Sequence, residues 1–164
     1  MTETDRPQTP GRPNGAAPEP SDVPEARPAE LQGLDALVGE WEVEVPAPGG
    51  VGGRTAFEWL DGGFFLVQRW TIDHAEAVNG IAVIGAEAGG GLKQRYFDSR
   101  GVHRVYEMGL DGGVWRLWRS SPGFSQRFTG RFADGGETIE GVWEKSAGGA
   151  HWERDFAMVY RKIG

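Results

Sequence analysis

The fold can be predicted from residues 102–120, which read VHRVYEMGLDGGVWRLWRS. Apolar and polar side chains alternate on both sides of Asp111-Gly112-Gly113, and a period of two is typical of a β-strand with one buried face. Glycine adopts positive φ angles without steric cost, and aspartate can bond to its own backbone, so Asp-Gly-Gly suits a tight hairpin. The stretch therefore predicts two antiparallel strands, at residues 102–108 and 114–120.

The tripeptide Asp-Gly-Gly occurs twice more, at residues 61–63 and 134–136, and each copy is followed by another alternating run. The pattern extends along the chain and predicts further strands at residues 39–45, 54–60, 64–73, 81–86, 92–98, 124–132, 138–145 and 151–162. With short links and no helix between them, these roughly ten strands favour an all-β fold, an antiparallel up-and-down β-barrel. A β-sandwich is the alternative architecture.

The segment before the first predicted strand has a different composition. Residues 1–29 hold seven of the ten prolines and no aromatic residue, which predicts a disordered tail. Leu31, Leu34 and Leu37 then recur at helical spacing, so we expect a short N-terminal helix that packs its leucines against the strands. The predicted organisation is a Pro-rich tail followed by one barrel domain at residues 30–164.

The overall composition excludes several classes of function. The net charge is −7, with 24 acidic against 17 basic residues, which argues against a nucleic-acid or anionic-membrane partner. The chain has no cysteine, which excludes disulfides and thiolate metal sites. No apolar stretch approaches the roughly 20 residues that span a bilayer, and the N-terminus lacks the apolar run of a secretory signal. We therefore expect a cytoplasmic protein, as a monomer or homodimer.

Two short motifs lie on the first and last predicted strands, Gly39-Glu40-Trp41 and Tyr160-Arg161-Lys162. They resemble motifs of the calycins, the superfamily of lipocalins and fatty-acid-binding proteins. In that superfamily the tryptophan lies across the closed end of the barrel, and an arginine from the last strand packs over it. The resemblance implies that Gly39, Trp41 and Arg161 act structurally in barrel closure, where a guanidinium over an indole contributes roughly 0.5–2 kcal/mol.

Three further stretches extend the resemblance: LVGEW at residues 37–41, GGFFLV at 62–67 and WERDF at 152–156. They are similar to a group of bacterial lipocalin-like proteins that has no agreed activity. The resemblance covers roughly residues 34–163. It supports a calycin-like barrel and implies no particular chemistry.

Alternation also predicts which side chains point into the barrel, and the predicted inward faces are aromatic with a few polar groups among them. Ligand pockets have that composition, because apolar walls supply contact and a few polar groups fix orientation. The side chains that we predict to line such a pocket and bind the ligand are Gln68, Trp70, Gln94, Tyr96, Arg104, Tyr106, Gln126, Phe128 and Arg154. A buried polar group without a partner costs about 1–3 kcal/mol, so these groups must bond to one another, to water or to a ligand.

The leading functional hypothesis from the sequence is a small-molecule binding protein that holds a hydrophobic or amphipathic ligand in the barrel. Arg104 or Arg154 would then meet a carboxylate or other acidic head group, because arginine presents a fork that suits it. A barrel enzyme, an isomerase, cyclase or hydrolase that uses interior Asp98, Tyr96 and Arg104, is an alternative. The chain has no recognised catalytic motif, so no catalytic residue is assigned.

The histidines bear on cofactors and metals. Barrel relatives called nitrobindins hold haem through a histidine on a late strand, and His151 is the nearest candidate by position. It lies beside a Gly-Gly turn, where an exposed histidine is the ordinary outcome, so we expect no cofactor and keep haem binding as an alternative. The three histidines do not cluster in sequence, and no metal site is predicted.

Overall fold

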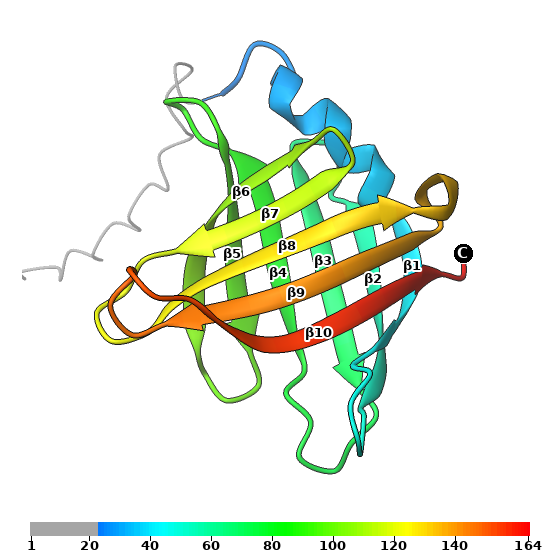
Figure 1. Cartoon of the computed structure of the whole chain (residues 1–164). Coiled ribbons are helices and arrows are strands. Elements are labelled where there is room, and N and C mark those ends of the chain that lie inside the picture. The colour runs from blue at the N-terminus through cyan, green and yellow to red at the C-terminus, as the bar shows by residue number, and fades with distance from the viewer. Residues whose placement is uncertain (1–22) are drawn as a thin grey trace, which may run out of the picture.

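The computed structural model describes residues 23–164, in which ten antiparallel strands form a closed barrel (Figure 1). Each strand pairs with the next one in the chain, and the last strand pairs with the first, which closes the barrel. The strands are β1 (Gly39–Glu44), β2 (Gly52–Trp59), β3 (Phe65–Ile72), β4 (Gly80–Ala86), β5 (Leu92–Asp98), β6 (His103–Asp111), β7 (Val114–Arg119), β8 (Ser125–Ala133), β9 (Thr138–Ser146) and β10 (Glu153–Lys162). The predicted up-and-down barrel of about ten strands is confirmed, and the alternative β-sandwich is wrong. The architecture is compatible with a calycin-like fold.

The Asp-Gly-Gly copies do form the connections between strands, with different geometries. Between β6 and β7, Gly112 and Gly113 have φ angles of 55° and 73°, and the residues on either side of them pair directly. Two consecutive positive φ angles give the tight hairpin whose twist matches that of its strands. The copy before β9 instead forms the short 3₁₀ turn η3 (Asp134–Gly136). The tripeptide thus predicts where the chain turns but does not by itself predict the type of turn.

One end of the barrel is covered by η2 (Ala29–Leu37), a 3₁₀ helix. Leu31, Leu34 and Leu37 are three residues apart, so they share one face of a helix that has three residues per turn. All three side chains are fully buried against the barrel core. The indole Nε1 of Trp41 donates a hydrogen bond of 2.8 Å to the backbone oxygen of Leu37, which fixes the helix to β1. The predicted short helix is confirmed and defines the closed end.

The cation over Trp41 differs from the one that the family resemblance implied. Lys162 pairs directly with Trp41 across β1 and β10, and its Nζ lies 5.2 Å from the centroid of the indole ring. Arg161 points to the other side of the sheet, where its Nη1 lies 3.0 Å from a carboxylate oxygen of Glu44. Neighbouring residues of a strand face opposite sides of the sheet. A shift of one position along β10 therefore places Lys162, rather than Arg161, over Trp41. Gly39 has a φ of 126°, and a side chain there would collide with the backbone of the C-terminal residue.

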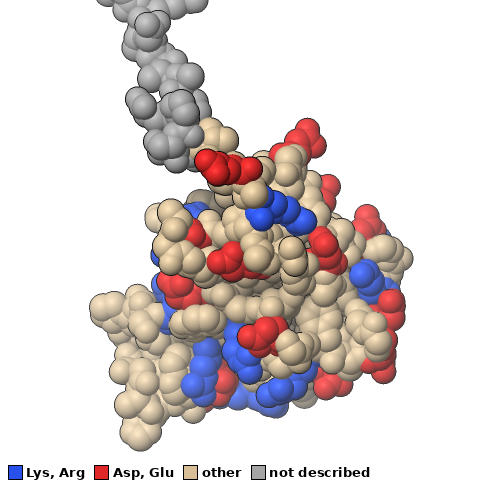
Figure 2. Space-filling view, turned by 90° about the horizontal axis from the view of Figure 1, so that it is seen from above, with Lys and Arg blue, Asp and Glu red and all other residues tan. Residues whose placement is uncertain are grey.

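The predicted N-terminal tail falls mostly on residues 1–22, which lie outside the described residues. Arg27 lies in the remainder of that segment, and its guanidinium stacks 4.3 Å from the ring centroid of Trp59. Its Nε also donates a hydrogen bond of 2.9 Å to the backbone oxygen of Gly63, so contact with the barrel begins before η2. Within residues 23–164 no helix is long and apolar enough to cross a membrane. Acidic and basic side chains are interspersed on the face seen in Figure 2.

Candidate functional site

The barrel encloses a cavity of about 590 Å³. Its lining includes residues of the loops that follow β1, β3, β5 and β7, such as Val45, His74, Arg100 and Phe124. These loops lie at the end of the barrel opposite η2, so the cavity opens there. Eight strands already leave room for a small ligand, and ten strands give a wider interior. The volume lies within the range of about 300–1,000 Å³ that is usual for small-molecule sites.

The walls of the cavity are largely apolar and aromatic. The apolar side chains that form most of the wall are Val43, Trp70, Trp115, Leu117, Phe128, Trp143, Met158 and Tyr160. The ring of Trp70 stacks on Tyr96 with 5.1 Å between centroids, and Trp115 meets Phe128 edge to face at 4.8 Å. Such ring pairs fix one another, so the walls are preformed rather than created by a ligand.

Eight of the nine side chains predicted from the sequence to point inward line this cavity. They are Gln68, Trp70, Gln94, Tyr96, Arg104, Tyr106, Gln126 and Phe128. Their role in binding a ligand stays a prediction, while their position is a property of the fold. They come from β3, β5, β6 and β8, so the barrel gathers residues that are up to 60 positions apart in the chain.

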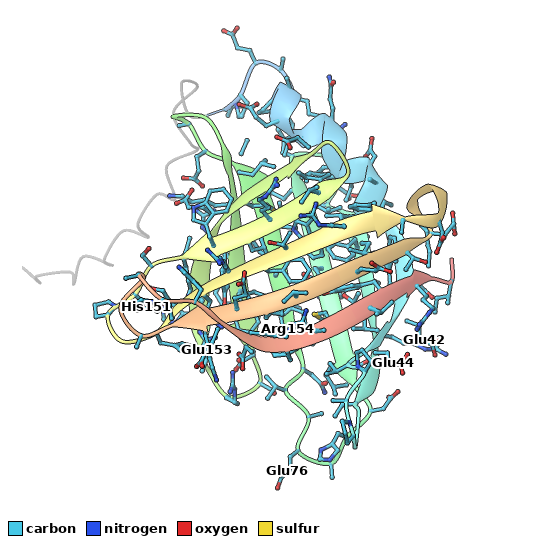
Figure 3. All side chains as sticks on the ribbon, in the orientation of Figure 1. Glu42, Glu44, Glu76, His151, Glu153 and Arg154 are labelled. Carbon is cyan, nitrogen blue, oxygen red and sulfur yellow. The ribbon has the colours of Figure 1, made fainter. Side chains whose placement is uncertain are left out.

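Arg154 is the exception, and its predicted inward orientation is wrong. It is exposed on β10, where Figure 3 labels it. It lies opposite Glu144, whose carboxylate pairs with Arg127. The register between β9 and β10 shifts between Arg154 and Phe156, so that Phe156 rather than Arg154 points into the cavity. A β-bulge of this kind adds one residue to a strand and reverses the alternation beyond it.

The most concentrated polar group in the cavity surrounds the side-chain oxygen of Gln126. This Oε1 atom accepts three hydrogen bonds, from Arg104 Nη1 at 3.1 Å, Tyr106 Oη at 3.0 Å and Arg119 Nε at 3.0 Å. Burial raises the pKa of Tyr106, although the guanidinium of Arg104 acts in the opposite direction. The phenol therefore stays protonated and donates at neutral pH. We call these four residues the Gln126 cluster.

The Gln126 cluster contains two cations and no anion. Among residues 23–164, neither Arg104 nor Arg119 has a carboxylate oxygen within 4.0 Å. Arg119 is held in place by a second hydrogen bond, from Nη2 to the backbone oxygen of Phe124 at 3.2 Å. Arg104 lines the cavity and makes one hydrogen bond to a described residue, which leaves most of its N–H donors free. The cluster is therefore able to receive an anion.

A second polar cluster, of Tyr96, Asp98 and Arg100, lies at the mouth of the cavity. The side chain of Asp98 is fully covered and accepts hydrogen bonds from Tyr96 Oη and from Arg100 Nη2, each at 2.7 Å. The hydrogen bond from Arg100 holds the pKa of Asp98 far below its usual range, and burial raises the pKa of Tyr96. Asp98 is thus an ionised carboxylate whose acceptor positions are occupied, and its ion-pair partner is Arg100 rather than Arg104.

The three histidines lie on different elements: His74 follows β3, His103 begins β6 and His151 follows β9. His151 is exposed on the turn between β9 and β10 (Figure 3) and does not line the cavity, so the structure does not place it where the haem alternative needs it. His74 does lie at the mouth, where its Nδ1 accepts a hydrogen bond of 3.2 Å from the backbone of Glu76. No group of three or more His, Asp or Glu side chains in residues 23–164 is arranged to hold a metal ion.

The sequence interpretation missed Arg119, although a signal for it exists. Trp115, Leu117 and Arg119 alternate along β7, and the first two are buried, so the same period predicts that Arg119 faces inward. The period does not reveal that Arg119 and Arg104 approach the same oxygen atom. That approach depends on how far β6, β7 and β8 are staggered in the closed barrel.

No model of a known protein family matches the chain, and no curated protein matches it either. The interpretation of the cavity therefore depends on its own geometry and chemistry.

Proposed function

We propose that the protein binds a small amphipathic molecule in the barrel, with an acidic head group held at Arg104 and an apolar part against the aromatic walls. The observation that carries this proposal is the Gln126 cluster, in which two guanidinium groups meet a neutral oxygen, and of which Arg104 and Gln126 line a largely apolar cavity. The calycin-like fold suggested by the sequence motifs supports a binding role as well, and membership of that superfamily is part of the proposal.

The position of the Gln126 cluster suggests how such a ligand would lie. Arg104 is the second residue of β6 and Gln126 the second residue of β8, and both strands begin at the open end. A head group at Arg104 would therefore lie near the mouth. The apolar part would extend toward η2, along Leu117, Phe128 and Trp143.

The chemistry of the head group follows from the guanidinium. Arginine offers a planar set of donors that matches a carboxylate, and its charge persists at any physiological pH. Hydrogen bonds to charged groups contribute about 1.5–3 kcal/mol, which is more than a neutral hydroxyl gains at the same place. The cluster should therefore discriminate an acid from an alcohol of equal chain length.

Isothermal titration calorimetry with decanoate and decanol tests this proposal. The wild-type protein should bind decanoate saturably and about tenfold or more tightly than decanol, because about 1.4 kcal/mol corresponds to one factor of ten. Arg104→Met, which keeps much of the side-chain length, should abolish the preference. Arg116→Met is the matched control, since Arg116 is exposed on the outer face of the neighbouring strand. Saturable binding of neither probe, or an unchanged preference in Arg104→Met, would overturn the proposal.

We favour binding over catalysis because of the state of Asp98. A general base needs a free acceptor and a pKa near the working pH. Asp98 is instead engaged by Tyr96, Arg100 and two backbone N–H groups, and its pKa is lowered. This bonding pattern suits a cluster that shapes the mouth of the cavity.

A further inference from the structure

Two polar atoms in the cavity wall have no hydrogen-bond partner. Within residues 23–164, the buried side-chain nitrogen and oxygen atoms that lack a partner are Gln94 Oε1 and Trp115 Nε1. The side chains are almost completely enclosed, with Gln94 4% and Trp115 1% exposed, and both line the cavity. Buried polar atoms are nearly always paired, because leaving one unpaired sacrifices its bonds to water. One of the two atoms is an acceptor and the other is a donor.

A third group close to Trp115 is poorly satisfied. The side chain of Tyr160 is buried, and the one hydrogen bond of its hydroxyl to a described residue is to the thioether of Met158, at 3.5 Å. A thioether is a weak acceptor, so this phenol retains most of its capacity to bond. The rings of Tyr160 and Trp115 are 5.9 Å apart between centroids. Burial raises the pKa of Tyr160, so the group is a neutral hydroxyl.

The other two glutamine side chains that line the cavity do have hydrogen-bond partners. Gln68 Nε2 donates to Thr55 Oγ1 at 3.2 Å, and Thr55 Oγ1 in turn donates to the backbone of Arg69 at 3.0 Å. The Oε1 atom of Gln126 accepts three hydrogen bonds within the Gln126 cluster. The barrel therefore satisfies its interior amides at other positions, and it leaves Gln94 Oε1 and Trp115 Nε1 unpaired in residues that line the cavity.

We propose that the ligand carries hydroxyl groups in its buried part as well as an acidic head group, so that it is a hydroxylated amphipathic acid. This inference rests on the proposed function, since it concerns the same cavity. A hydroxyl oxygen accepts a hydrogen bond and its O–H donates one, which supplies what Trp115 Nε1 and Gln94 Oε1 respectively lack. An unsubstituted hydrocarbon chain would leave both atoms unpaired.

The test is calorimetric titration of the full chain with decanoate and with a set of monohydroxydecanoates that carry the hydroxyl at successive carbons. At least one isomer should bind about tenfold or more tightly than decanoate, because it pairs a buried group that decanoate leaves unpaired. Trp115→Phe and Gln94→Met remove the donor and the acceptor, and each should reduce this preference for the hydroxylated isomer. Trp118→Phe is the control, because Trp118 is exposed on the outside of the same strand.

The outcomes separate this inference from the function on which it rests. If decanoate binds but no isomer binds more tightly, the inference is overturned and the proposed function stands. A preference that persists in both variants also overturns it. If decanoate and its hydroxylated isomers all fail to bind, both proposals are overturned. Should Trp115→Phe fail to fold, as a thermal melt would reveal, Gln94→Met still decides the question, since it keeps the length of the side chain.

Discussion

The closed end of the barrel pairs its indole groups, whereas the wall of the cavity leaves one indole unpaired. At the closed end, the indole of Trp41 donates to Leu37 and that of Trp59 donates to Asp35 Oδ1, each at 2.8 Å. In the cavity, the indole of Trp115 has no acceptor among the described residues. The indole groups at the closed end are paired within the protein, so these residues stabilise the fold. The cavity keeps polar groups that the protein does not pair, so its residues are available to a ligand.

Substitution at the closed end should produce the largest loss of stability. Trp41→Ala should lower the free energy of unfolding by about 3–5 kcal/mol, because it removes a fully buried ring and leaves a cavity beneath η2. Trp70→Ala at the mouth should cost clearly less, because that ring is only partly buried. Urea denaturation of the two variants measures the difference. Equal losses would contradict the division of the barrel into a packed end and an open end.

Ionisation of the three tyrosines should cause a loss of stability of intermediate size as the pH rises. The pKa of Tyr96, Tyr106 and Tyr160 is raised in each case by burial, and the chain has no other tyrosine. A folded-state pKa above the usual value of about 10 stabilises the protein below that pH, and the stabilisation is lost as the pH rises further. Tyrosinate absorbance should therefore appear together with loss of the circular dichroism of the folded barrel. Ionisation of all three tyrosines near their usual pKa in a folded protein would contradict this account.

The smallest losses of stability are expected for substitutions at Lys162 and Arg161, and the two losses should differ. Lys162→Met removes a cation from the face of the buried Trp41 and should cost about 0.5–1 kcal/mol. Arg161→Met removes an exposed ion pair with Glu44 and should cost less, with the loss disappearing at high salt. Denaturation at low and high salt distinguishes them. A larger effect at Arg161 would restore the arrangement that the sequence motif implied.

The fold was predictable because its signals are local. Alternation within each strand and Asp-Gly-Gly between strands are visible in short windows, and they predict a meander of about ten strands whichever register those strands adopt. The spacing of Leu31, Leu34 and Leu37 likewise predicts a helix with one buried face.

Residue roles that depend on register were harder to predict. The bulge before Phe156 turns Arg154 outward, and the pairing of Trp41 with Lys162 turns Arg161 outward. A shift of one residue changes the face of every side chain beyond it, and nothing in a single strand reveals such a shift. The Gln126 cluster joins side chains of β6, β7 and β8, so it depends on three registers at once.

A crystal structure of the protein with bound decanoate is the most direct test of the central claim, that the open half of the barrel is a site for an acidic amphipathic ligand. We predict that the carboxylate lies within hydrogen-bonding distance of the guanidinium of Arg104, with the alkyl chain among the aromatic walls and directed toward η2. Decanoate bound outside the barrel, or inside it with the carboxylate away from Arg104, would contradict the claim.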